Sequence, residues 1–476
     1  MITRPTYEKA RSIRHCCQLA GSRLLSVERK YDGEYCQVHI DLSRGQDCIK
    51  IFSKSGRDST TDRTGLHNTL RQSLALDDAD CPIKKQCIVE GELLVWNDRY
   101  QRIEPFYKIR NHVKRAGRFL GNARDSPADL CEHLMIIFYD ILLLDDIICI
   151  CETHDKRRQR LQSLVHCIPG RADIGNREVI DFSSLAAPER LRQAFSQAIT
   201  QRWEGFVLKG CRDPYISFHS QNRYIKLKKD YIVGLGDTAD FAVVGGFRDA
   251  KDEQELGIGK LWWTSFYIGC LDNKEAVRRF GAKPKFRLID SVDRHGISKQ
   301  NILFLNRRGY FKRVPFTTSR PELDVGFGQL QLSRSSEIFK SPFIVEVTGA
   351  GFDKLPNTSY FTLRFPRIQK IHQDRAFEDI VGYDELQELA KRAMEPLPSC
   401  ESQEQRYWIE KLHARSRHSH PVPRAMGGAL DDNTSVEKDI VTPSKRKLSA
   451  GIPPLLASAA KRAKGSATGS IDGKAI

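Results

Sequence analysis

The residue with the clearest potential for chemistry is Lys30, which stands directly before Tyr31-Asp32-Gly33. An apolar run over residues 24–27 precedes it, and an alternating apolar and polar run over 34–42 follows. A lysine at such a corner between two predicted strands can project its amine into a cleft. Because a lysine before Asp-Gly is common, its meaning depends on the other reactive side chains along the chain.

Carboxylates, lysines and an aromatic residue recur near the ends of later predicted strands. Glu92 falls within an apolar run, and Glu204 directly precedes another. Alternation places Lys226 and Lys228 on one face of a strand, where their like charges repel each other unless an anion lies between them. Tyr139 stands in a third apolar run and is either a platform for a ring or part of the core.

Composition and charge point to a protein with polyanionic partners. The chain has 76 Lys and Arg and 60 Asp and Glu, which gives a net charge of +16. This charge favours binding to nucleic acid but does not distinguish DNA from RNA. The 13 cysteines form no Cys-x-x-Cys pair, which indicates reduced thiols in a cytosolic or nuclear protein. No apolar run approaches the ~18 residues of a membrane span.

The pattern of apolar runs predicts two folded domains and a tail. Residues 1–232 read as an α+β domain with antiparallel sheets, and residues 233–376 have the short, glycine-broken strands of a small barrel, for which an OB-fold is expected. Residues 377–398 predict a helical extension. Residues 399–476 are polar, rich in Pro, Ser and Ala, and predict a disordered basic tail.

Two basic clusters stand in this tail, Lys445-Arg446-Lys447 and Lys461-Arg462-Ala463-Lys464. Together they have the form of a bipartite nuclear import signal, and the alternative is a solvated basic tail. The first interpretation places the protein in the nucleus.

The reactive residues, taken in order, resemble the signature of the eukaryotic-type ATP-dependent DNA ligases, a branch of the covalent nucleotidyltransferases. The series is Lys-x-Asp-Gly (30–33), Ser-Lys-Ser-Gly (53–56), Glu-Gly-Glu (90–92), Tyr-Asp-Ile-Leu (139–142), Glu-Gly-Phe-Val-Leu-Lys (204–209), Lys-Leu-Lys-Lys-Asp (226–230) and Leu-Arg-Phe-Pro-Arg (363–367). As an ordered series over most of the chain it is highly specific. The last element favours DNA ligases over messenger RNA capping enzymes.

The resemblance implies a nucleotidyltransferase domain in which Lys30 attacks the α-phosphate of ATP and carries AMP through a phosphoramide bond. Lys226 and Lys228 would bind that phosphate and lower the pKa of the Lys30 amine. Glu92 and Glu204 would place Mg²⁺ against the phosphates.

Further contacts with the nucleotide are implied on both domains. Tyr139 would stack on adenine, and Glu28 would help to select the base. Lys54 and Lys209 are suited to nucleotide or phosphate contacts. Arg364 and Arg367 would reach over the cleft from the OB domain and orient pyrophosphate.

The implied substrate is nicked double-stranded DNA, bound by a monomer that acts in repair, recombination or replication, with or without a repair-protein partner. AMP would pass to the 5′-phosphate, and the 3′-hydroxyl would then displace it. Candidate contacts with the DNA backbone are Lys108, Arg110, Lys312 and Arg313.

Two departures from the pattern keep other functions open. Tyr35 stands where the family has an arginine that contacts the nucleotide, and Lys30 lies too early for the helical DNA-binding domain that large eukaryotic ligases carry before it. The chain is then a truncated form or resembles minimal ligases. The alternatives are a catalytically degenerate homologue that binds DNA or acts as a scaffold, and an RNA capping or RNA ligase nucleotidyltransferase.

Overall fold

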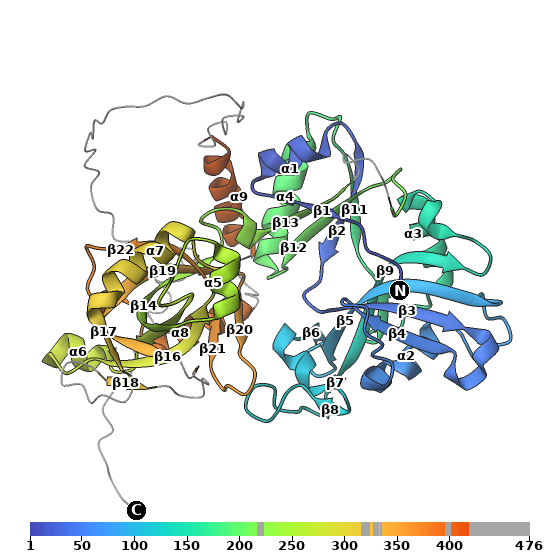
Figure 1. Cartoon of the computed structure of the whole chain (residues 1–476). Helices are drawn as coiled ribbons and strands as arrows, with labels where there is room; N and C mark the ends of the chain where they lie inside the picture. The colour runs from blue at the N-terminus through green and yellow to red at the C-terminus, as the bar shows by residue number, and fades with distance from the viewer. Residues whose placement is uncertain (217–222, 316–323, 327–332, 334–335, 396–400, 418–476) are drawn as a thin grey trace, which may run out of the picture.

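The computed structural model describes residues 1–216, 223–315, 324–326, 333, 336–395 and 401–417. They form two lobes, one built from strands β1 to β13 and the other from β14 to β22 (Figure 1). Within these residues, no helix combines the length and the apolar character that a membrane crossing needs. The predicted α+β class is confirmed, since helices flank sheets whose strand pairs are mostly antiparallel.

The first sheet of the first lobe carries the Lys30 corner. Its strand order is β1 (Tyr7–Ala10), β13 (Tyr224–Lys228), β12 (Gly205–Gly210), β2 (Leu24–Lys30) and β11 (Arg177–Asp181). Leu25 and Val27 of β2 pack in a core with helices α1 (Ile13–Ala20) and α4 (Ala187–Thr200). Because side chains alternate along a strand, Glu28 and Lys30 face away from this core.

The second sheet of this lobe has the order β10 (Ala172–Ile174), β9 (Glu132–Leu144), β5 (Gln86–Asn97), β3 (Glu34–Asp41) and β4 (Ile49–Ser53), with β6 (Arg102–Ile103) paired to β5. Its core face packs with α2 (His67–Ser73) and α3 (His154–Leu164) and includes Cys36, Val38 and Ile40, as the alternation in the sequence predicts. A small hairpin joins β7 (Lys114–Arg115) to β8 (Arg118–Phe119). The opposite face of this sheet turns toward β2 and β12, since the Lys209 ammonium of β12 lies 5.0 Å from the centre of the Tyr139 ring of β9.

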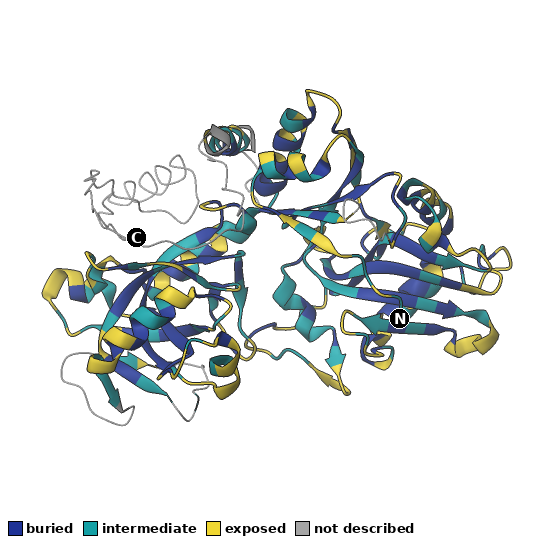
Figure 2. Cartoon of the chain, turned by 45° about the horizontal axis from the view of Figure 1, so that its top comes forward, coloured by how far each residue is buried: buried dark blue, intermediate teal, exposed yellow. Residues whose placement is uncertain are grey.

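The second lobe is organised around a seven-stranded sheet. Its order is β17 (Arg313–Pro315), β19 (Glu337–Gly349), β14 (Asp237–Phe247), β15 (Ser265–Leu271), β16 (Lys285–Val292) and β18 (Asp324–Gly326), with β22 (Arg367–His372) paired to β19. A hairpin, β20 (Phe352–Lys354) and β21 (Phe361–Leu363), and helices α5 (Ala250–Leu256), α6 (Lys274–Phe280), α7 (Lys299–Gly309) and α8 (Tyr383–Met394) complete it. Buried strands lie beneath more exposed helices (Figure 2). The register of β14 shifts at Gly245, where a Cβ atom would lie 2.3 Å from the carbonyl oxygen of Glu337.

Helix α9 (Glu401–Arg417) follows the second lobe in sequence but packs on the first, beside α4 and α1 (Figure 1). Trp408, 1% exposed, and Leu412 enter the first-lobe core, and Glu404 accepts a 2.7 Å hydrogen bond from Arg202. The prediction of a disordered tail is therefore wrong for 401–417, because two apolar side chains four positions apart give this polar stretch one buried face. The two basic clusters lie outside the described residues.

We expect Trp408→Ala to release α9 from the first lobe. Replacing a fully buried tryptophan with alanine costs about 3–5 kcal/mol, enough to make docking of one helix unfavourable. Amide hydrogen exchange over 401–417 should then accelerate by at least about a hundredfold. The matched control is Arg406→Ala on the exposed face of the same helix, which should leave exchange unchanged. Equal protection in both variants would contradict the packing described.

Candidate active site

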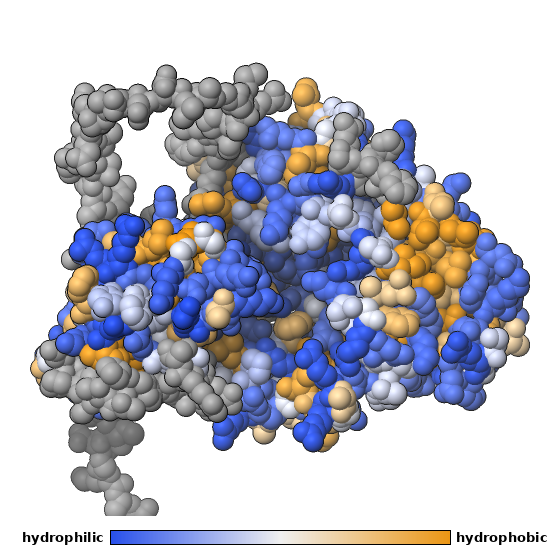
Figure 3. Space-filling view, in the orientation of Figure 1, coloured by the Kyte–Doolittle hydropathy of each residue, from blue (hydrophilic) through white to orange (hydrophobic). Residues whose placement is uncertain are grey.

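Lys30 lines a cavity of about 920 Å³ that lies between the two lobes. Asp32 and Glu204 line it from the first lobe, and Phe352 and Arg364 line it from the second. The space-filling view shows this hollow between the lobes, with a largely hydrophilic surface around it (Figure 3). The Lys30 side chain is 24% exposed, so it is enclosed and still accessible from the cavity.

Strand register brings the Lys30 and Lys228 side chains together. Gly205 of β12 is paired with Lys30 of β2 on one side and with Lys228 of β13 on the other. Gly205 has φ 141°, and a Cβ atom there would lie 2.2 Å from the carbonyl oxygen of Leu227, so only glycine fits. Glu204 then lies between the two amines: it accepts a hydrogen bond from Lys30, and its Oε1 is 2.7 Å from Lys228 Nζ.

The prediction that the pKa of Lys30 is lowered is wrong. Burial favours the neutral amine, but Glu204 and then Glu92 outweigh it, so the pKa of Lys30 is raised. The same balance raises the pKa of Lys228, which also lies 3.3 Å from Asp230 Oδ1. Glu204 therefore offsets the repulsion between the amines of Lys30 and Lys228.

Lys226 is the lysine whose pKa is lowered, to about 8, by burial and by the positive charges of Lys30, Lys54 and Arg4. Its ammonium lies 3.5 Å from the centre of the Tyr7 ring. It forms no ion pair with any residue that the structure describes. Glu204 acts on it only at a distance, so an anion that entered beside Lys30 would find an amine that is not ion-paired.

Glu92 approaches the site from the second sheet, where β3 pairs it with Tyr35. Burial, opposed by Lys30, raises the pKa of Glu92 to about 7, and the negative charges of Glu204 and Asp32 act in the same direction. Glu92 and Glu204 thus offer hard oxygen donors beside the amine of Lys30, and Asp32 adds negative charge nearby, although the oxygens of the three are not all within 4.8 Å of one another. Such a donor set suits a divalent cation.

Tyr139 and Lys209 lie deeper, between the two sheets. The Lys209 ammonium is 5.0 Å from the centre of the Tyr139 ring, and it lies 2.8 Å from Glu28 Oε2. Glu28 Oε1 also contacts His154 Nε2 at 2.7 Å. Burial favours the neutral acid, but Lys209 and His154 outweigh it and hold the pKa of Glu28 well below its usual range. Both Glu28 and Lys209 are buried and already bound to partners.

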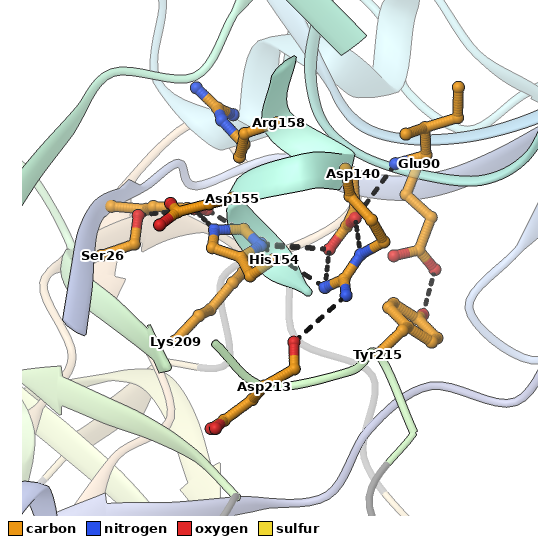
Figure 4. A network of polar contacts seen from close by, with 12 residues as sticks. Ser26, Glu90, Asp140, His154, Asp155, Arg158, Lys209, Asp213 and Tyr215 are labelled. Carbon is orange, nitrogen blue, oxygen red and sulfur yellow. Dashed lines mark hydrogen bonds and ion pairs between the residues drawn. The ribbon is translucent and has the colours of Figure 1, made fainter. Parts of the chain in front are cut away.

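The buried polar network that joins Asp140, His154 and Tyr215 contains residues that no sequence motif singled out (Figure 4). Asp140 Oδ1 accepts a 2.7 Å hydrogen bond from Arg157 Nε, and its Oδ2 lies 3.9 Å from His154 Nδ1. Glu90 accepts a 2.7 Å hydrogen bond from the Tyr215 hydroxyl. The run of charged residues at the start of α3 was the available signal, but nothing in it showed that His154 and Arg157 would be buried.

Tyr35 is bound into this network. Its hydroxyl donates to Glu90 and accepts a 3.1 Å hydrogen bond from Gln37 Nε2. Burial and then the Glu90 carboxylate raise the pKa of Tyr35. The guanidinium of Arg4 lies 4.9 Å from the centre of the Tyr35 ring.

The second lobe contributes Arg364 and Arg367 to the site. Arg364 is ion-paired with Asp32, beside Lys30, and its guanidinium lies 4.4 Å from the centre of the Phe106 ring. Arg367 Nη2 is 3.2 Å from Asp230 Oδ2 in the segment that follows Lys228. The structure therefore brings both arginines to the lysine motifs of the first lobe.

The candidate DNA contacts are placed differently from one another. Lys108 is held 2.6 Å from Glu132 Oε1 and Arg110 3.3 Å from Asp353 Oδ2, and both side chains are largely buried. This arrangement argues against the exposed role that the sequence suggested for these two. Lys312 and Arg313 stack on aromatic rings of the second lobe, Lys312 on Phe343 at 4.3 Å.

Residues 6–228 match the family model of the ATP dependent DNA ligase domain. DNA ligase 4 of Dictyostelium discoideum is 23% identical over 388 residues, which cover 76% of this chain and 33% of that protein. DNA ligase 1 of Saccharomyces cerevisiae is 25% identical over 403 residues, which cover 82% of this chain and 47% of that protein. The chain thus spans less than half the length of these two relatives.

Among solved structures, a mycobacterial DNA ligase D complexed with ATP and MES matches with a TM-score of 0.34 and 16% identity. The match covers 75% of this chain and 92% of that chain.

Proposed function

We propose that the protein seals nicks in double-stranded DNA through a covalent lysyl-AMP intermediate, a proposal supported by the match of residues 6–228 to the family model of the ATP dependent DNA ligase domain. The observation that carries the proposal is the placement of the Lys30 amine. It lines the cavity between the lobes, touches Glu204, and shares one row of the sheet with Lys228.

The first step is an in-line displacement at phosphorus. Lys30 loses its proton, and its nitrogen forms a bond to the α-phosphorus of ATP while the bond to pyrophosphate breaks. Lys226 and Lys228 hold the α-phosphate, and Tyr139 packs against adenine. Arg364 exchanges its partner Asp32 for the leaving pyrophosphate, which carries more negative charge. The 5′-phosphate and 3′-hydroxyl of the nick then react in turn.

Glu92 and Glu204 are the residues that would hold Mg²⁺, because both carboxylates act on the Lys30 amine and the Glu92 carboxylate has no ion-paired partner among the described residues. Bound there, the ion would neutralise charge on the phosphates. The protein contributes by holding these carboxylates in place at the strand ends and beside the turn at Gly33.

We extend the proposal to the rest of the chain. Residues 1–232 act as the nucleotidyltransferase domain, and residues 233–376 act as an OB-fold domain that closes over the cavity and contacts DNA through Lys312 and Arg313. The tail directs the protein to the nucleus, where it works as a monomer in repair, recombination or replication.

The test of this function is transfer of label from ATP. The protein is incubated with Mg²⁺ and α-labelled ATP or GTP, denatured, and examined for retained label. Label from ATP, followed by sealing of a nicked duplex, supports the ligase. Label from GTP would indicate capping, and sealing of RNA alone would indicate an RNA ligase. Absence of label would favour the degenerate homologue to which Tyr35 pointed.

The lowered pKa of Lys226 predicts a pH dependence of nucleotide binding. In the protein without nucleotide, the Lys226 amine is charged below pH 8 and neutral above it. A bound phosphate would raise the pKa of this amine, so nucleotide binding above pH 8 takes up a proton. The ATP concentration that gives half-maximal labelling should therefore rise between pH 8 and 9 by up to about tenfold. Lys226→Met should bind more weakly and lose this dependence; a variant with the same pH profile as wild type would contradict the assignment.

A further inference from the structure

The segment that precedes β1 crosses from one sheet of the first lobe to the other. Ile2 is bound to the second sheet, because its backbone N–H donates to Gln37 Oε1 at 2.8 Å and its carbonyl accepts from Gln37 Nε2 at 3.1 Å. Gln37 is fully buried, so this anchor is fixed. Tyr7 begins β1, which pairs with β13 in the first sheet. Arg4 lies between these two anchors in the sequence, and its guanidinium contacts the Tyr35 ring of the second sheet.

The conformation of Arg4 is restricted from both sides. Pro5 follows it, and a residue before proline is held to extended backbone conformations. Its guanidinium lies 4.9 Å from the centre of the Tyr35 ring, and the Tyr35 hydroxyl is itself fixed by Glu90 and Gln37. Arg4 is therefore presented at a defined place rather than free in solvent.

Arg4, Lys54 and Lys226 form a cationic cluster at the edge of the active site. Arg4 and Lys54 are close enough to Lys226 to lower its pKa. Within the described part of the chain, none of the three has an ion-paired carboxylate, although such pairs are frequent elsewhere in this protein. Glu204 offsets part of the positive charge on Lys226, but three like charges this close are still unfavourable unless an anion completes the group.

We propose that Arg4 is a nucleotide-binding residue that, together with Lys54 and Lys226, holds the phosphates of ATP beside Lys30. The inference rests on the proposed function, because it takes the Lys30 cavity as the nucleotide site. A guanidinium can bind phosphate oxygens in bidentate fashion, and no carboxylate among the described residues forms an ion pair with Arg4. Tyr35 thus positions the guanidinium of Arg4 through contact with its ring.

The test compares wild type with Arg4→Ala, Arg4→Lys and Arg14→Ala, the last being an exposed arginine on α1. In the labelling assay, Arg4→Ala should raise the ATP concentration for half-maximal labelling by about tenfold, with nearly full labelling at saturating ATP. Arg4→Lys should recover part of the loss, and Arg14→Ala should match wild type. Wild-type labelling with an unchanged ATP dependence in Arg4→Ala would overturn the inference.

A binding measurement separates this inference from the proposed function. Equilibrium binding of ATP is measured in the Lys30→Ala background, with and without Arg4→Ala, and it needs no turnover. The same loss of about tenfold is expected, and equal affinities would contradict the proposal even if no variant were labelled. A second arm compares nicked DNA with a 5′-phosphate or a 5′-hydroxyl. A loss confined to the 5′-phosphate duplex would assign Arg4 to DNA and overturn its role in ATP binding.

Discussion

Lys30→Ala should abolish formation of the labelled protein from α-labelled ATP, with a loss of at least about a thousandfold. The Lys30 amine lines the cavity and contacts Glu204 at the strand end. Alanine has only a methyl group at this position, so the variant lacks the nucleophile. Initial rates of label incorporation at saturating ATP measure the effect.

The matched control for this variant is Lys229→Ala. Lys229 follows Lys228 and also lines the cavity, but it pairs with Asp237 at 2.8 Å and lies outside the row of Lys30, Gly205 and Lys228. This variant should keep most of the wild-type rate. Label that persisted on Lys30→Ala would assign the nucleophile to another residue.

Glu204→Gln should reduce the initial rate of label incorporation by about a hundredfold, although the Lys30 proton becomes easier to remove. The Glu204 carboxylate raises the pKa of Lys30, so its loss increases the neutral fraction of the amine. The same substitution removes a charge between Lys30 and Lys228 and one of the proposed ligands of Mg²⁺. Positioning and neutralisation of charge on phosphates outweigh the gain in free amine.

The pH profile distinguishes these two effects. The acid limb of the rate should shift toward lower pH in Glu204→Gln, because a lysine that has lost its carboxylate partner deprotonates more readily. The maximum should nevertheless stay low and require more Mg²⁺. A variant with the wild-type maximum would show that Glu204 only holds the Lys30 proton.

The strand positions of the site could be predicted from the sequence because local patterns determine them. Alternation placed Cys36, Val38 and Ile40 on the core face of β3, and it placed Lys226 and Lys228 on one face of β13. The order of short motifs likewise identified Lys30 and Glu204, which the structure brings into contact although they are 174 positions apart.

The electrostatic balance of the site could not be predicted, because it depends on contacts between distant segments. The raised pKa of Lys30 follows from the register at Gly205, which inserts Glu204 between two amines. The Glu28 and His154 pair joins residues 126 positions apart, and no periodicity marks it. Helix α9 was not predicted from the sequence, because only a few residues of this polar stretch form its buried face.

The central claim is that the Lys30 nitrogen accepts an adenylyl group. Peptide mass spectrometry of the protein after incubation with ATP and Mg²⁺ tests it most directly. The account predicts one added AMP on the peptide that contains Lys30, lost again on addition of pyrophosphate. An adduct mapped to another residue, or an unmodified Lys30 peptide in protein that seals nicks, would contradict it.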